Sequence, residues 1–175
     1  MSSRMIRARV ARAVVWRIAR RPHALDRLGI GARQDGGRWN RAGTAVIYAG
    51  GTIAIAALEK FVHLAGVVPA DLVLVRIELP ERHSAEAPRR ADLPRDWDLA
   101  PPGPGSIEFG TTWAREGRSL VLYVPSALVH EESNAVLNPN HPEFASVTMA
   151  IQREFRYDAR LYRPRQAQAA RKPRR

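Results

Sequence analysis

The chain has 175 residues, 45% of them hydrophobic, which predicts one compact domain with a real core and too little chain for two. It contains no cysteine, which excludes disulfides, thiolate chemistry and cysteine-ligated zinc and agrees with a reducing cytoplasm. Because no apolar run reaches the roughly 18 residues that a membrane-spanning helix needs, the sequence predicts a soluble, cytoplasmic protein without a membrane partner.

The formal net charge of +11 suggests a nucleic-acid partner until the charges are located along the chain. About seven basic residues and no acid fall in residues 1–21, and about seven more, again without an acid, fall in residues 160–175. The body between them carries about 14 basic residues against all 17 acidic ones, so it is slightly acidic. The tail therefore predicts a disordered segment that attracts polyanions loosely, and DNA binding through the arginine-rich ends is kept as a minor alternative.

The first apolar pattern lies among arginines near the N-terminus. Val14, Trp16 and Ile18 belong to an apolar face, which predicts a helix or strand that docks on the core. The same region is Arg-rich and acid-poor, as in a transit peptide, but it lacks the apolar stretch of a signal peptide. Residues 24–28 then predict a short helical piece that ends at Gly29.

A glycine-rich stretch at residues 29–37 leads into the first candidate site. Its glycines do not follow a strand and open a helix, so it is neither a P-loop nor a dinucleotide fingerprint, and we expect a mobile loop that delivers Arg38. Residues 44–48 have the β-branched and aromatic bias of a buried strand. A guanidinium suits phosphate or a planar polar ring, and a tyrosine face suits a flat cationic ring, so Arg38 and Tyr48 predict one wall of a small-molecule site. A surface stack or ion pair of Arg38 is the alternative.

Residues 53–64 have apolar side chains at helical spacing after a turn and an N-cap, which predicts a helix. Glu59 lies among apolar neighbours on this helix, with His63 one turn away. A solvated helix carboxylate is the ordinary interpretation of such a residue. In a pocket beside an arginine it would stay ionised and stabilise positive charge on a substrate, which makes Glu59 a candidate for the only acid of the pocket.

Two further stretches, residues 72–79 and 119–124, are apolar and β-branched enough to predict buried strands. Residues 81–105 between them are rich in proline, arginine and acids, which predicts a long surface loop with a short anchored piece that includes Trp97. Ser126 follows the second strand. We expect it to form hydrogen bonds rather than to act as a nucleophile, because no base stands beside it in the sequence.

The last part of the chain alternates between polar and apolar segments. Residues 131–134 and 138–142 predict a polar loop in which His141 is a turn residue, and the histidines show no metal-binding spacing. Residues 147–151 alternate as a final strand. Short strands with few helices predict a mixed α/β or α+β domain with a mixed sheet.

Several blocks of the chain, in the same order, resemble the RES domain, the toxin half of Xre-RES type II toxin-antitoxin modules. The blocks are WR at residues 16–17, GGRWN at 36–40, Tyr48, ALE at 57–59, LPRDW at 93–97, VPSA at 124–127, Asn134, NPNHP at 138–142 and FRYDARL at 155–161. GGRWN and NPNHP are the most specific, whereas residues 28–35 depart from the usual pattern. The resemblance implies a RES domain at 14–162, a basic segment at 1–13 and a basic disordered tail at 163–175.

The resemblance implies a single domain with an ADP-ribosyltransferase-like fold and an enzyme that destroys NAD by cleaving its nicotinamide-ribose bond. ADP-ribose would pass to water or to inorganic phosphate as a co-substrate, or in the alternative to a protein. Glu59 is carried over as the catalytic carboxylate, and Arg38 and Tyr48 as residues that serve both catalysis and NAD binding. No metal is implied. The NAD-binding set is Arg17, Arg38, Asn40, Tyr48 and Ser126.

The chemistry of the reaction agrees with these residue types. Loss of the neutral nicotinamide ring leaves an oxocarbenium-like ribose, so the site needs a nearby negative charge and a held ribose. Glu59 can supply both by accepting the ribose 2′-hydroxyl, while Arg38 would bind the diphosphate or the amide and Tyr48 would stack on the pyridinium. A nucleotide-binding module without turnover is the alternative, and the presence of Glu59 speaks against it.

The resemblance also implies a protein partner, an Xre-type helix-turn-helix antitoxin that blocks the pocket. DNA would then be contacted only indirectly, through the antitoxin. The sequence leaves the acceptor of ADP-ribose open, and it leaves open whether the chain forms a homo-oligomer.

Overall fold

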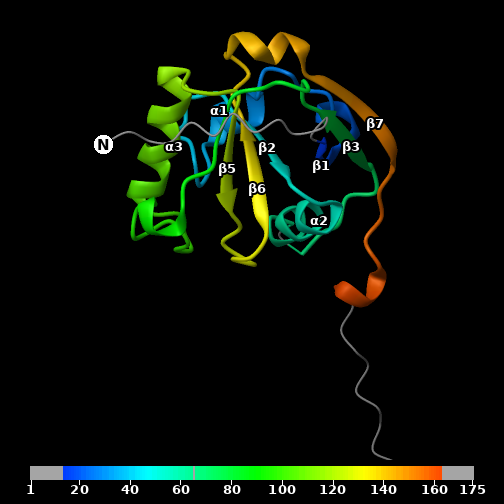
Figure 1. Ribbon diagram of the computed structural model, residues 1–175. Helices are drawn as coiled ribbons and strands as arrows, with labels where there is room; N and C mark the ends of the chain where they lie inside the picture. The colour runs from blue at the N-terminus through cyan, green and yellow to red at the C-terminus, as the bar shows by residue number, and fades with distance from the viewer. Residues whose placement is uncertain (1–13, 65, 163–175) are drawn as a thin grey trace, which may run out of the picture.

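The computed structural model describes residues 14–64 and 66–162, and it contains the following elements (Figure 1). The strands are β1 (Val14–Arg20), β2 (Ile47–Gly50), β3 (Leu72–Glu78), β4 (Ala85–Glu86), β5 (Val121–Pro125), β6 (Ser133–Leu137) and β7 (Thr148–Glu154). The α-helices are α1 (Ile30–Asp35), α2 (Ile53–Val62) and α3 (Pro104–Glu116). Short 3-10 helices lie at Arg21–His23, Arg90–Asp92, Pro142–Ser146 and Ala159–Leu161. The basic segments predicted at 1–13 and 163–175 lie outside the described residues.

The strands of the described residues form one seven-stranded sheet in the order β4-β5-β6-β2-β1-β3-β7. The short strand β4 runs parallel to β5, and the other neighbours are antiparallel. The mixed α/β class with a mixed sheet that the sequence predicts is therefore confirmed.

Helices α2 and α3 cover the same face of the sheet at different strands (Figure 1). Trp113 of α3 packs with Leu122 of β5 and Val136 of β6 in one buried cluster. In a second cluster Ala57 of α2 packs against Ile18 of β1 and its neighbours on β3. Strand register places all of these strand residues on one face, which is also the face of Tyr48. Between the two helices this face presents Tyr48 of β2 and Asn134 of β6.

The opposite face of the sheet carries the largest buried cluster. It joins residues from distant strands, such as Val75 of β3 and Leu137 of β6, with Leu79, Phe144 and Val147 from the connections. Because strands from both ends of the sheet contribute to one cluster, the sheet curves around it. This core fixes β1 and β2, the strands on which the site depends.

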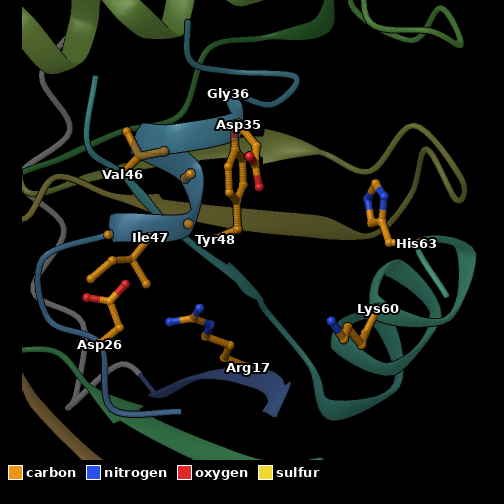
Figure 2. A pocket seen from close by; sticks show the side chains of 12 residues that line it. Arg17, Asp26, Asp35, Gly36, Val46, Ile47, Tyr48, Lys60 and His63 are labelled. Carbon is orange, nitrogen blue, oxygen red and sulfur yellow. The ribbon is translucent and has the colours of Figure 1, made fainter. Parts of the chain in front are cut away.

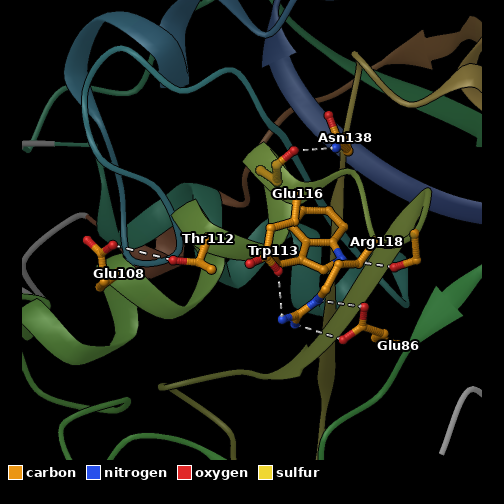
Figure 3. Close-up of polar contacts among 9 residues, drawn as sticks. Glu86, Glu108, Thr112, Trp113, Glu116, Arg118 and Asn138 are labelled. Carbon is orange, nitrogen blue, oxygen red and sulfur yellow. Dashed lines mark hydrogen bonds and ion pairs between the residues drawn. The ribbon is translucent and has the colours of Figure 1, made fainter. Parts of the chain in front are cut away.

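The C-terminal end of α3 is tied to the sheet by polar contacts (Figure 3). Arg118 donates from Nε and Nη2 to the two carboxylate oxygens of Glu86 in β4, at 3.0 and 2.9 Å. Trp113 donates from Nε1 to Ser119 Oγ, and Asn138 donates from Nδ2 to the carbonyl of Ala114, both at 2.8 Å. The bonds of Trp113 and Asn138 satisfy buried groups, the ion pair of Arg118 is exposed, and all of them belong to the scaffold rather than to a ligand site.

The elements differ from the sequence predictions at three places. The stretch expected as a mobile loop contains α1, because Asp26 accepts from the N–H groups of Leu28 and Ile30 and so starts the helix there rather than at residues 24–28. No helix is predicted after the loop at 81–105, yet α3 runs from Pro104 to Glu116 and is capped by Gly117 in the left-handed region. Within the polar loop predicted at 131–134, Ser133 and Asn134 instead begin β6. Trp97 is buried, as expected.

Candidate active site

The sheet is loosely joined between β1 and β2. Trp16 and Gly50 form the one register pair between these strands, although β1 pairs with β3 along its whole length. Beyond that pair the strands diverge, and a cavity of about 330 Å³ opens between them (Figure 2). Ile47 and Tyr48 both line it. Since successive strand residues point to opposite faces, this places the cavity at the open edge of β2.

Arg17 enters the cavity from β1, with its guanidinium directed toward Asp26 in Figure 2. Its Nη1 is buried and has no hydrogen-bond partner among the described residues. Burial lowers the pKa of Arg17, and the carboxylate of Asp26 opposes that shift. A buried guanidinium nitrogen without an acceptor is unfavourable by itself, so this position suits an anion that accepts from it.

Helix α2 adds a second cation to the cavity. Lys60 of α2 and His63 at its end also line the cavity, as Figure 2 shows. Burial lowers the pKa of Lys60, and repulsion from Arg17 and Arg20 lowers it further. Arg17 and Lys60 repel one another, and an anionic ligand between them would stabilise both charges. These two residues are called the cationic wall below. Asp26 and Asp35 line other parts of the cavity, so its surface carries both signs of charge.

Tyr48 stands on β2 with its ring in the cavity wall and its hydroxyl engaged. The hydroxyl accepts from the backbone N–H of Trp39 at 2.9 Å and donates to Asn40 Oδ1 at 2.7 Å. Burial raises the pKa of Tyr48, against the opposing effects of the Trp39 hydrogen bond and of Arg38. A Cβ on Gly37 would lie 2.7 Å from this hydroxyl, so the glycine is what lets the loop close over the ring. Tyr48 offers its ring, not its hydroxyl, to a ligand.

Arg38 and Asn40 are held by the protein itself. Arg38 donates from Nη1 to the carbonyls of Trp97 and Leu99, at 2.9 and 2.7 Å, and so fixes the segment 97–99. Asn40, 1% exposed, donates from Nδ2 to the carbonyls of Ala32 and Thr44. Neither residue lines the cavity. Both order the loop that carries them, and Asn40 also accepts from the hydroxyl of Tyr48.

Glu59 has two neutral hydrogen-bond donors on the same oxygen. Its Oε1 accepts from Ser126 Oγ at 2.7 Å and from Asn134 Nδ2 at 2.6 Å. The other oxygen, Oε2, accepts no hydrogen bond from the described residues. The sequence analysis expects an arginine beside this carboxylate, and the structure has a serine and an asparagine there instead. The arrangement fixes the carboxylate and leaves one oxygen for a ligand.

The carboxylate lies next to the cavity rather than in its lining. Asn134 pairs with Gly50, and Tyr48 lies two residues from Gly50 along β2, so the amide of Asn134 and the ring of Tyr48 share one face of the sheet. Such diagonal neighbours are about 7 Å apart. Glu59 also precedes Lys60 on α2. One compact region therefore holds a fixed carboxylate, an aromatic ring and a cationic wall.

Of the residues named from the sequence, the structure brings Arg17 and Tyr48 together at the cavity and joins Glu59 to Ser126 beside it. Arg38 and Asn40 lie behind this group. Sequence reasoning did not single out Asn134 or Lys60 as site residues. Asn134 opens an otherwise apolar strand, and Lys60 follows the candidate acid directly; both are weak signals without the fold.

In the described parts of the chain, no three histidine, cysteine or acidic side chains gather in a way that could hold a metal ion. No helix within residues 14–64 and 66–162 is long and apolar enough to cross a membrane.

The fold is a curved mixed sheet in which β1 and β2 separate at a cavity. Arg17 and Lys60 line this cavity, and the carboxylate of Glu59, bonded to Ser126 and Asn134, lies beside it. The model of the RES domain matches residues 14–158, and the chain belongs to the RES domain family.

Curated relatives that match most of the chain are named as toxins. The chain is 43% identical over 154 residues to the "Prs ADP-ribosylating toxin" of Sphingobium sp. (strain YBL2), covering 85% of this chain and 96% of the relative. It is 35% identical over 146 residues to "Toxin Res" of Yersinia enterocolitica, covering 82% and 95%. Among solved structures, a chain of the M. tuberculosis MbcT-MbcA toxin-antitoxin complex has a TM-score of 0.63 at 16% identity, with 87% of each chain covered, which shows the shared fold.

Proposed function

We propose that this chain is the toxin of a toxin-antitoxin module and that it cleaves the nicotinamide-ribose bond of NAD in the cytoplasm. The observation that carries the proposal is the carboxylate of Glu59, with Oε1 held by Ser126 and Asn134 and with Oε2 left without a protein donor among the described residues. Relatives named as toxins, one of them ADP-ribosylating, support it. The proposed unit is the domain at residues 14–162.

In this reaction the bond between the ribose C1″ and the nicotinamide nitrogen breaks, and its electron pair leaves with the ring. The ribose becomes oxocarbenium-like, and an acceptor then supplies an oxygen to C1″ and loses a proton. Oε2 of Glu59 would accept the ribose 2″-hydroxyl, so that negative charge is in place where positive charge develops. A carboxylate already held by two donors need not reorganise at the moment of reaction.

The rest of NAD would lie along the opening between β1 and β2. Its diphosphate needs cations, and Arg17 and Lys60 provide them in the cavity wall, where Arg17 Nη1 lacks an acceptor among the described residues. The ring of Tyr48 offers a face to the pyridinium until it leaves. In this arrangement Arg38 acts indirectly, because its bonds to Trp97 and Leu99 hold the loop that closes over Tyr48.

The acceptor distinguishes two candidate functions. Transfer to water, or to inorganic phosphate as a co-substrate, makes the chain an NAD-depleting toxin. The 43% identical relative is named an ADP-ribosylating toxin with Prs as its target, which favours a protein acceptor as the second candidate. Both share the donor chemistry at Glu59 and differ in what reaches C1″ from the open side.

We further propose an antitoxin partner of the Xre helix-turn-helix type, so that DNA would be contacted through the antitoxin alone. The support is the likeness of the fold to a chain of a toxin-antitoxin complex. Whether the free chain is a homo-oligomer does not affect this proposal.

The test is to incubate the purified, antitoxin-free chain with NAD, with and without phosphate and with and without a cell extract, and to follow nicotinamide release. Mass spectrometry then separates free ADP-ribose, its 1″-phosphate and modified protein. Nicotinamide release in any of these mixtures supports the proposal, and the product assigns the acceptor. No release in any of them, from a chain shown to be folded, would overturn it.

A further inference from the structure

The amide of Asn134 lies at the carboxylate on which the proposed reaction depends. Its Nδ2 donates to Glu59 Oε1 at 2.6 Å from the middle strand of three, since β6 is paired on one side with β5 and on the other with β2. We infer that Asn134 is a positioning residue, which fixes the orientation of the Glu59 carboxylate and keeps the neighbouring site free of a second negative charge. This inference rests on the proposed function.

The hydrogen bonds around Ser126 determine that its hydroxyl donates to Glu59. Ser126 Oγ accepts from the backbone N–H groups of Leu128 and Val129, at 3.0 and 3.2 Å, and its own proton goes to Glu59 Oε1. Asn134 can likewise only donate to that oxygen, through its amide nitrogen. Two donors on Oε1 hold the carboxylate in one rotation and leave Oε2 as the oxygen that a ligand can use.

The backbone brings the two partners together through a close approach of α2 to β2. A Cβ on Gly50, the residue paired with Asn134, would lie 2.6 Å from the backbone nitrogen of Ala56. The absence of that Cβ allows the first turn of α2 to sit against the strand. Glu59, one turn further along α2, then reaches over β6 to the amide. The contact is therefore built into the fold rather than made by a surface side chain that happens to lie nearby.

An asparagine suits this position better than an isosteric aspartate. Aspartate at 134 would place a second carboxylate within hydrogen-bond distance of Glu59, and two such groups share a proton up to a higher pH than one alone. Titratable side chains on the elements around Glu59 are Arg17 and Arg20 of β1, Tyr48 of β2, Lys60 and His63 at the end of α2, His130, Glu131 and Glu132 before β6, and Tyr157, whose hydroxyl donates to the carbonyl of Ala57 in α2. All of them remain in the variants below, so a shifted pH profile reports the added carboxylate.

The experiment compares N134D and N134A with N138D. Asn138 is more deeply buried than Asn134 and donates to the carbonyl of Ala114 in the scaffold, away from Glu59, so N138D makes the same chemical change without touching the carboxylate (Figure 3). Nicotinamide release from NAD is measured from about pH 5 to 9, with melting curves of each variant.

For N134D we expect the acid limb of the kcat profile to move up by about one pH unit or more. For N134A we expect kcat to fall about tenfold while KM for NAD changes less than about twofold, because orientation is lost and binding is not. N138D should lower the melting temperature and leave the position of the acid limb unchanged.

The outcomes separate this inference from the proposed function. A wild-type chain that releases no nicotinamide overturns both. An active wild type with an acid limb of N134D at the same pH as that of N138D overturns the positioning role alone. If N134D does not fold, N134A decides: a rise in KM with unchanged kcat, or no change in either, rejects the inference.

Discussion

The two charged centres of the site are built in opposite ways. The carboxylate of Glu59 is held by neutral groups: two donors bind Oε1, and no cation of the described residues forms an ion pair with it. The cationic wall is unsatisfied: Arg17 Nη1 has no acceptor in the described residues, and burial with neighbouring arginines lowers the pKa of Lys60. Under the proposed function, the negative centre serves the transition state, whereas the positive centre serves ligand binding.

The largest effect on activity is expected from E59Q, which changes the negative centre alone. This change keeps the shape of the side chain and removes its charge, so nicotinamide release should fall about a hundredfold or more, with KM for NAD and the melting temperature little altered. Steady-state kinetics and a thermal melt measure both. Retention of more than about a tenth of the activity would remove Glu59 from its catalytic role.

R17M tests the positive centre by the opposite signature. Loss of a charge-assisted hydrogen bond to the diphosphate should raise KM for NAD about 30-fold, equivalent to about 2 kcal/mol, with a smaller effect on kcat. R27M is the matched control, because Arg27 donates to the carbonyls of Val147 and Phe144 in the scaffold. It should lower stability and leave KM unchanged. Equal KM values for the two variants would mean that Arg17 is not a ligand residue.

S126A removes one of the two donors from the negative centre. We expect kcat to fall about tenfold and KM to stay within about twofold, since Asn134 still holds Oε1. S106A is the control: Ser106 is also fully buried, but its Oγ donates to the carbonyl of Gly103 at the start of α3. Should S106A lower kcat as much as S126A, the effect of S126A would be one of folding.

K60M should weaken NAD binding and increase the stability of the fold. Because the folded state lowers the pKa of Lys60, the unfolded chain binds that proton more tightly, and stability rises with pH between the lowered pKa and the ordinary one. K60M should therefore melt about 2 °C higher than wild type at pH 7, with the gap closing at alkaline pH, and should raise KM for NAD about threefold. A lower melting temperature of K60M than of wild type at pH 7 would show that the charge of Lys60 does not destabilise the folded chain.

The apolar strands could be predicted from the sequence because a run of apolar and β-branched residues indicates a buried strand without knowledge of its tertiary contacts. Helix α3 could not, since its glycines and threonines have weak helix propensity and burial of Trp113 and Ala114 stabilises it instead. The start of β6 reads as a loop because Ser133 and Asn134 are polar. Asn134 is explained only by its carboxylate partner on a distant helix.

The sequence names candidate site residues but not the contacts among them. The resemblance names Glu59 and Ser126, but 67 residues separate them, and no local pattern indicates that one donates to the other. Arg38 shows the converse: its place in a specific motif suggests a ligand contact, and the bonds to Trp97 and Leu99 appear only once the loop at 93–99 has folded back.

The single register pair between β1 and β2 also has a mechanical consequence. Seven residues of β1 pair with β3, whereas Trp16 alone pairs with β2, so this junction is the seam of the sheet where the fewest ladder bonds resist separation. A long dinucleotide that lies along the seam would bridge both sides of it. Under the proposed function, NAD binding should therefore slow amide hydrogen exchange at the facing edges of both strands.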